Sequence, residues 1–470
     1  MSVRPMAMST PSAEGVDTTG VHALLDALEA APDIEPHSLM ILRHGKVVAS
    51  GWWAPYTAER PHLLYSLSKS FTATAAAFAA AEGLLRLDDT VLSYFPEFDA
   101  DITDPRSRAM LVRHITTMAS GHEAETHDRA RAIDRDEPVR GFLLVPPDRE
   151  PGTVFAYNQP ATYALAAIVQ RVTGQSLTDY LRPRLFDPLG IGEVAWLRGR
   201  TGRELGYSGL HATTDAIARL GQLYLQRGVW EGERLLPEEW VAEGTRSHIV
   251  NPDGGWVDWA QGYGFQFWMS RHGYRGDGAY GQYCLVLPEQ DAVVAITGAT
   301  HEMQKVLDLV WEHLLPAFGA GPLPGREKAD TALAERLARL ALPPAAGKPA
   351  PLAQAVSFTP YDGGCEGLPE LTAVEVDAEG RTLTLVEDGH RLELRFGEAG
   401  WTVTEGPVPA AVSGGWTDPD TLALDVAFLE TPHHVDLTCS LADRTVTARW
   451  RTEPLHGPRL RAMCAPRDAR

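Results

Sequence analysis

The sequence predicts an α/β domain built around a mixed sheet, followed by an antiparallel β-domain. The chain has 470 residues, which is too long for one ordinary domain. Up to about residue 316, strand patterns are followed by helices, more strands and a final helix, which favours a sheet formed from both ends of the domain. After residue 356 only strand patterns recur. We therefore expect a domain over 1–316, a linker over 317–355 and a β-domain over 356–470.

The first half of the predicted domain begins with a hairpin. Residues 36–53 contain two β-rich runs around His44-Gly45. An alanine-rich helix is expected next, because residues 71–85 are almost all small or apolar. Further helical patterns cover 109–118, 162–174 and 212–228. The last two end at glycines, which commonly terminate helices.

Strands dominate the chain from residue 262. Three runs separated by turn residues lie within 262–298, and residues 303–318 then form a helical pattern. The linker combines Pro-, Gly- and Ala-rich flanks with a short amphipathic helix at 331–342. Seven alternating runs follow residue 356, so we expect a barrel-like antiparallel domain of seven or eight strands.

Composition excludes several functional classes. The net charge of −20 argues against nucleic acid or an anionic membrane as partner. No stretch reaches the roughly 18 uninterrupted apolar residues that span a bilayer, and the N-terminus lacks the apolar segment of a signal peptide. The four cysteines are widely spread and form no CxxC pair. We expect a cytoplasmic protein without a disulfide framework or zinc site.

Ser66 and Lys69 are the most informative pair in the sequence. Positions i and i+3 lie on one face of a helix, so the Lys69 amine can reach the Ser66 hydroxyl. Burial beside the alanine-rich helix would lower the pKa of the lysine and let it act as the base that activates the serine. A helix start also directs free backbone N–H groups toward a developing oxyanion. Because Ser-x-x-Lys also occurs by chance, the interpretation needs further motifs.

Three longer stretches supply those motifs. Residues 65–98 join the Ser-x-x-Lys helix to a Gly-Leu-Leu-x-Leu-Asp-Asp turn, and residues 151–174 join Pro-Gly-x-x-Phe-x-Tyr to a helix closed by Thr-Gly. Together with residues 208–240, they resemble the serine hydrolases related to class C β-lactamases, D-alanyl-D-alanine peptidases and esterases. The resemblance covers about residues 30–316. It implies a β-lactamase-like fold with a helical subdomain, and an acyl-enzyme formed on Ser66.

The resemblance also implies a second base and a carboxamide. Tyr157 would share the Ser66 proton and later donate it to the leaving group, provided that the site lowers the pKa of its phenol. The family's Tyr-x-Asn motif becomes Tyr157-Asn158-Gln159 in this chain. Either Asn158 or Gln159 can therefore supply the carboxamide that holds the lysine and the substrate.

The third family motif is altered. Where the family has Lys-Thr-Gly or His-x-Gly on a strand, Gly278 aligns with the final glycine, and Gly276 takes the position of the cation. In the family the second oxyanion donor is the backbone N–H that follows the final glycine, and the resemblance assigns that role to Ala279. The cation that grips a substrate carboxylate is then missing, unless Arg271 or Arg275 reaches the site.

Histidines outside these motifs offer weaker candidates. His301 follows a strand end and can supply a polar group if it approaches the pocket. The spacing of His122 and His127 fits no standard metal site, and their stretch is expected in a surface loop. The pair His433-His434 is expected to face solvent in the β-domain.

The motifs together predict a serine hydrolase that acts through an acyl-enzyme on an ester or amide of a small molecule or short peptide. An acyltransferase or peptide cyclase, in which an amine or hydroxyl replaces water, is one alternative. A catalytically weak ligand-binding protein is another, because the third motif is altered. No cofactor or metal is expected, and the sequence does not indicate an oligomeric state.

Overall fold

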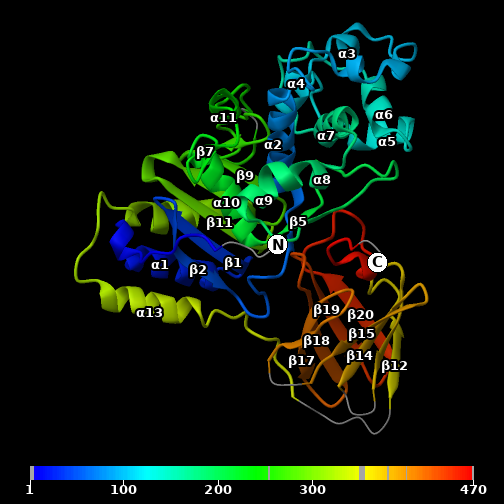
Figure 1. Ribbon diagram of the computed structural model, residues 1–470. Helices are drawn as coiled ribbons and strands as arrows, with labels where there is room; N and C mark the ends of the chain where they lie inside the picture. The colour runs from blue at the N-terminus through cyan, green and yellow to red at the C-terminus, as the bar shows by residue number, and fades with distance from the viewer. Residues whose placement is uncertain (1–4, 252–253, 349–354, 378–380, 398–399, 468–470) are drawn as a thin grey trace.

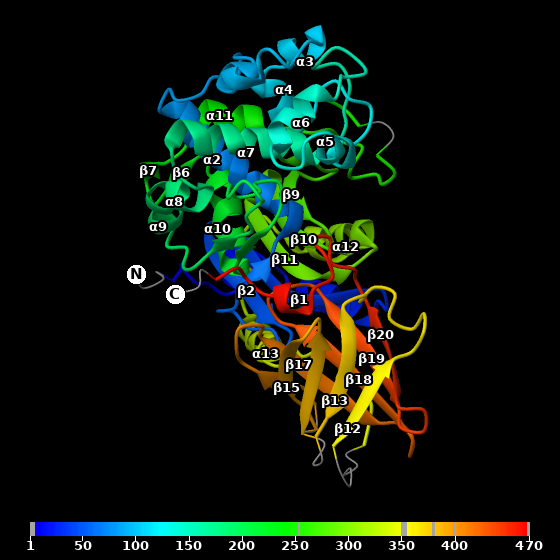
Figure 2. The same cartoon turned by 90° about the vertical axis from the view of Figure 1, so that its right-hand side faces the viewer.

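The computed structural model describes residues 5–251, 254–348, 355–377, 381–397 and 400–467. Figures 1 and 2 show a helical region at one end, a central sheet, and a β-barrel at the other end. Within the predicted linker, residues 349–354 lie outside the described residues.

Both ends of the first domain contribute to its six-stranded sheet, as predicted. The strand order is β2-β1-β11-β10-β9-β8, and all neighbours pair antiparallel. The predicted hairpin is β1 with β2. Almost every residue of β1 is buried, so both faces of the sheet are covered at this strand. The strands are β1 (Ile34–Arg43), β2 (Lys46–Trp52), β8 (Trp268–Met269), β9 (Tyr274–Gly278), β10 (Gln282–Leu287) and β11 (Ala292–Thr300).

Helices α10 (Thr214–Leu225) and α1 (Thr18–Ala30) pack against this sheet. α10 contacts β1, β10 and β11, and α1 contacts β1. The side chain of Asp17 caps α1 by accepting from the Thr19 N–H. The helix predicted at 303–318 is present in three successive parts: α12 (Met303–Leu309), the π-helical η7 (Val310–Leu314) and the 3-10 helix η8 (Leu315–Ala317).

The helical region contains the predicted alanine-rich helix, α2 (Ser68–Ala81), which is buried along almost its whole length. It packs against α7 (Gln159–Thr173), which ends at Gly174 in the left-handed conformation, as the sequence predicts. The predicted short helix at 109–118 is α4 (Val112–Thr116). The other helices of the region are α3 (Pro105–Ala109), α5 (His127–Ile133), α6 (Pro138–Leu144) and α8 (Leu177–Leu181).

Short elements complete the first domain and the linker. A 3-10 turn, η2 (Tyr65–Leu67), leads into α2. The helix predicted in the linker is α13 (Glu327–Leu337), which begins four residues earlier than expected. The remaining elements include β3 (His62–Leu63), β4 (Ala195–Trp196), β5 (Leu210–Ala212), β6 (Val229–Trp230), β7 (Glu233–Arg234), α9 (Asp187–Leu189) and α11 (Glu238–Gly244).

The C-terminal domain is a nine-stranded, nearly closed barrel with its own hydrophobic core. Its pairs are antiparallel except β12 with β20, and the edge strand β15 lies beside β16 and β17. The expectation of seven or eight strands is wrong, because the sheet has nine. Seven strands match the predicted runs, β12 and β17 were not predicted, and the alternation of β17 is obscured by Gly414 and Gly415. The strands are β12 (Val356–Pro360), β13 (Leu371–Val376), β14 (Thr382–Glu387), β15 (His390–Arg395), β16 (Thr402–Thr404), β17 (Ala410–Trp416), β18 (Thr421–Phe428), β19 (His434–Ser440) and β20 (Thr445–Trp450).

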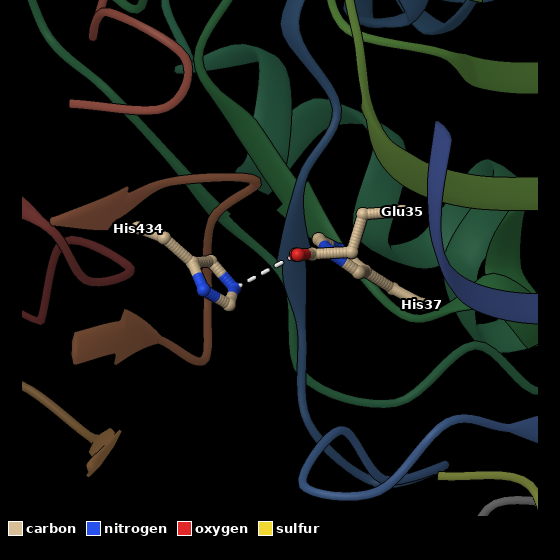
Figure 3. Close-up of side chains that lie close together, drawn as sticks. All are labelled: Glu35, His37 and His434. Carbon is tan, nitrogen blue, oxygen red and sulfur yellow. Dashed lines mark hydrogen bonds and ion pairs between the residues drawn. The ribbon is translucent and has the colours of Figure 1, made fainter. Parts of the chain in front are cut away.

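The prediction that His433 and His434 face solvent is wrong, because both are buried where the barrel meets the central sheet. His434 Nε2 lies 2.9 Å from Glu35 Oε1 on β1 (Figure 3). The Nδ1 of His434 lies 2.8 Å from Asp425 Oδ1. Burial alone would lower the pKa of His434, but the two carboxylates raise it to about 10. An imidazolium ion therefore joins the two domains at neutral pH.

Candidate active site

Ser66 lies in η2, the 3-10 turn that leads directly into α2. Its side chain lines a pocket of about 950 Å³. The backbone of β9 approaches this turn closely. A Cβ at Gly278 would collide with the Leu64 carbonyl, and a Cβ at Gly276 would collide with the Leu67 side chain. The two glycines thus let the strand pack against the turn, and Ala279 joins Ser66 in the pocket wall.

Lys69 contacts Ser66 as the spacing predicts. Its Nζ lies 3.0 Å from Ser66 Oγ, 2.6 Å from Gln159 Oε1 and 2.8 Å from the Tyr207 carbonyl oxygen. The side chain is 1% exposed, and this burial lowers the pKa of the amine to about 7. A substantial fraction of Lys69 is therefore neutral near pH 7. The contact with Tyr207 was not predicted, since a backbone acceptor leaves no signal in side-chain identity.

The Tyr157 ring lies next to the amine of Lys69. Lys69 Nζ is 4.7 Å from the centre of the Tyr157 ring, and Tyr157 lines the same pocket as Ser66. The ring stacks on Trp268 at 5.2 Å. Burial and the Asp277 carboxylate raise the pKa of Tyr157 well above its usual range, so the expectation of a lowered pKa is wrong. Of the two candidate bases, Lys69 is the one available near neutral pH.

The choice between the two carboxamides falls on Gln159, which contacts Lys69. Asn158 is fully buried, and its Oδ1 instead accepts from the backbone N–H and the hydroxyl of Thr126. Asn158 thereby anchors the start of α7. It makes no hydrogen bond to Lys69 or Ser66.

The altered third motif places an acid, not a cation, at the pocket. Asp277 lines the pocket with Ser66, whereas Arg275 is fully buried and bonds Asp277 Oδ2 through its Nε at 2.9 Å. Arg271 pairs with Asp258 and Asp308. Neither arginine therefore fills the vacant place of the cation.

His122, His127 and His301 are not among the described residues that line the pocket. His122 is fully buried between Ser120 and the Val145 carbonyl, so its predicted position in a surface loop is wrong. His127 begins α5 and packs edge-on against Tyr207. His301 is exposed and contacts the Tyr280 ring.

The pocket lining contains no lysine, arginine or histidine among the residues that the structure describes. Its charged members are Glu123, Glu125 and Asp277. Glu123 pairs with Arg149, and Asp277 pairs with Arg275. Glu125 accepts from the Gln159 N–H and has no ion pair with any described residue. Aromatic rings form much of the remaining wall, including Phe155, Tyr157, Trp259 and Trp268.

The fold and the Ser–Lys pair are those of a serine hydrolase, and comparison with known proteins gives the family. The beta-lactamase family model matches residues 21–314, so the chain belongs to this family of serine hydrolases. It is 28% identical over 299 residues to a 6-aminohexanoate-dimer hydrolase of Paenarthrobacter ureafaciens, covering 57% of this chain and 76% of that protein.

A further relative is similar in sequence, and a solved structure shares the fold. Penicillin-binding protein 4 of Amycolatopsis lactamdurans is 28% identical over 269 residues, which cover 49% of this chain and 70% of that protein. The solved structure of a family VIII carboxylesterase shares the fold, with a TM-score of 0.51 and 16% identity over 67% of this chain and 100% of that chain. Within the described residues, no helix has the length and apolar character needed to cross a membrane.

Proposed function

We propose that the protein hydrolyses an ester or amide of a small molecule or short peptide through an acyl-enzyme on Ser66. Ser66 Oγ attacks the carbonyl carbon while its proton passes to neutral Lys69, directly or through the Tyr157 phenol. The N–H groups of Ser66 and Ala279 hold the oxyanion. Return of the proton expels the alcohol or amine, and water then releases the acid by the same steps.

The observation that carries this proposal is the buried contact between Lys69 and Ser66. A lysine at its ordinary pKa would be protonated near pH 7 and unable to accept the serine proton. Here burial lowers the pKa of the amine to about 7 and its Nζ lies 3.0 Å from the hydroxyl. Gln159 and Tyr207 fix the amine from other directions, so the geometry does not depend on substrate.

The pH profile tests this assignment. Because only neutral Lys69 can act as the base, kcat/KM for an uncharged aryl ester should rise with pH and level off above an apparent pKa of about 7. The same limb should remain in Tyr157→Phe, although the rate is lower. A profile that is flat from pH 5.5 to 8.5 in the wild type would exclude Lys69 as the base.

The charge of the pocket narrows the substrate class. Its described lining carries only acidic charged groups, and its aromatic rings favour apolar or cationic groups. A carboxylate beside the scissile bond would be repelled and would find no cation. We therefore propose uncharged or ammonium-bearing acyl compounds as substrates, with β-lactams and D-alanyl peptides disfavoured.

A matched set of aryl esters tests this preference. The order of kcat/KM should be ammonium-bearing, then neutral, then carboxylate-bearing. Glu125→Gln keeps the oxygen that accepts from Gln159 but removes the charge, so it should reduce the ratio of ammonium to neutral ester about two- to fivefold. The control is Glu239→Gln on α11, which should leave the ratio unchanged. A wild-type preference for the carboxylate ester would overturn the proposed substrate class.

A further inference from the structure

Two tyrosines adjoin the residues whose N–H groups are proposed to hold the oxyanion. Tyr65 precedes Ser66, and Tyr280 follows Ala279. Both are buried, and both adopt left-handed backbone conformations, with φ of 47° and 67° respectively. Such conformations are uncommon for bulky residues and persist where surrounding contacts hold them.

The C-terminal domain provides these contacts for Tyr65. His433 Nδ1 lies 2.8 Å from the Thr452 carbonyl, which can only accept, so Nδ1 carries the proton and Nε2 is an acceptor. The Tyr65 hydroxyl donates to that Nε2 at 2.6 Å and accepts from the Leu455 N–H at 3.2 Å. Burial keeps His433 neutral by lowering its pKa to about 3. Every polar atom of this chain of hydrogen bonds is thus assigned a partner.

Tyr280 is held by the same segment. Its hydroxyl donates to the Glu453 carbonyl at 2.5 Å. Its ring makes edge contacts with both Tyr65 and His433, with centres 5.6 Å apart in each case. The C-terminal segment reaches from the barrel toward the central sheet (Figure 2).

A third contact joins the C-terminal segment to Ser208, the neighbour of Tyr207. Ser208 follows Tyr207, whose carbonyl accepts from Lys69, and the Ser208 hydroxyl lies 2.8 Å from His456 Nε2. The His456 ring also stacks on Tyr65 at 5.4 Å. Between these contacts, Leu455 forms part of the pocket wall.

We propose that the C-terminal domain positions the oxyanion-binding backbone of the first domain, through His433 and residues 453–456. This inference rests on the proposed acyl-enzyme chemistry at Ser66. Tyr65 and Tyr280 are positioning residues, since they act through the N–H groups of their neighbours Ser66 and Ala279. The oxyanion forms only during reaction, so the domain stabilises the transition state more than the bound substrate.

Removing the two hydroxyls in the full-length protein tests this role. Tyr65→Phe and Tyr280→Phe each delete a bond to the C-terminal domain and keep the ring. Each should lower kcat about tenfold while KM changes less than twofold, and the double variant should approach the roughly 10²- to 10³-fold loss of a missing oxyanion donor. The matched control is Tyr180→Phe, which removes a hydroxyl bonded to Glu82 from an equally buried tyrosine in α8.

A boronic acid that forms a tetrahedral adduct with Ser66 provides the readout specific to positioning. Its inhibition constant should weaken in parallel with kcat in both variants and stay unchanged in Tyr180→Phe. The positioning role would be overturned if Tyr65→Phe and Tyr280→Phe gave the same kcat and the same inhibition constant as Tyr180→Phe. This holds even if Lys69→Ala is inactive. Full activity in Lys69→Ala would instead refute the proposed chemistry. If Tyr65→Phe does not fold, Tyr280→Phe alone decides by the same criteria.

Discussion

Replacing Lys69 by alanine should lower kcat/KM for a neutral aryl ester by about 10²- to 10⁴-fold, the range associated with a positioned general base. The amine is the group within 3.0 Å of Ser66 Oγ whose pKa lies near neutrality. Its removal leaves the serine proton without an acceptor. The proposed oxyanion donors, the N–H groups of Ser66 and Ala279, are not changed by the substitution. Steady-state kinetics on the variant and the wild type at pH 8 measure the loss.

The control for this variant is Lys305→Ala, which removes an exposed amine on α12 and should leave kcat/KM unchanged. Circular dichroism and the melting temperature establish that Lys69→Ala is folded. If the cavity left by alanine prevents folding, Lys69→Met replaces the buried stem without the amine. Activity of a folded variant within fivefold of wild type would contradict the role of Lys69.

Tyr157→Phe should lower kcat by on the order of 10²-fold, because it removes the phenol that lines the pocket with Ser66 and that we propose relays the serine proton. The loss should not multiply with that of Lys69→Ala, since both groups act on one proton path. A double variant about as slow as Lys69→Ala is therefore expected. Fully multiplicative losses would mean that the two residues do not share the path. Tyr263→Phe, a buried tyrosine next to Tyr157, provides the control.

Local spacing in the sequence was sufficient to predict the alanine-rich helix and the contact between Ser66 and Lys69. A three-residue offset within one helix fixes which side chains meet, whatever the rest of the fold does. The central hairpin and the glycine-terminated helix α7 were predictable for the same reason. Each depends on turn chemistry and periodicity over a few residues.

Side-chain direction at the ends of elements was not predictable. Asn158 and Gln159 are adjacent at the start of α7, and only the position of Thr126 explains why the first turns away from Lys69. On β9, the sequence left open whether Arg275 fills the place of the cation. Its guanidinium lies over the Trp259 ring and bonds Asp277 on the same strand, and the choice between this arrangement and one that faces the pocket depends on how the segment around Trp259 folds back on β9.

Contacts between the two domains were the features least predictable from the sequence. His433 and His434 begin a run with the alternation of a strand, in which polar residues normally face solvent. Their partners Tyr65 and Glu35 lie more than 360 residues earlier in the chain. The placement of Leu455 in the pocket wall is equally non-local. The sequence carries no local signal for either contact, because each depends on how the barrel docks on the first domain.

The most direct test of the account is the site of covalent labelling by a fluorophosphonate probe. Treatment of the full-length protein, followed by digestion and peptide mass analysis, should place one label on Ser66 and none on Ser68 or Ser70. Ser66→Ala should remain unlabelled, and Lys69→Ala should label at least tenfold more slowly. A label mapped to another serine, or folded wild-type protein that takes up none, would contradict Ser66 as the nucleophile.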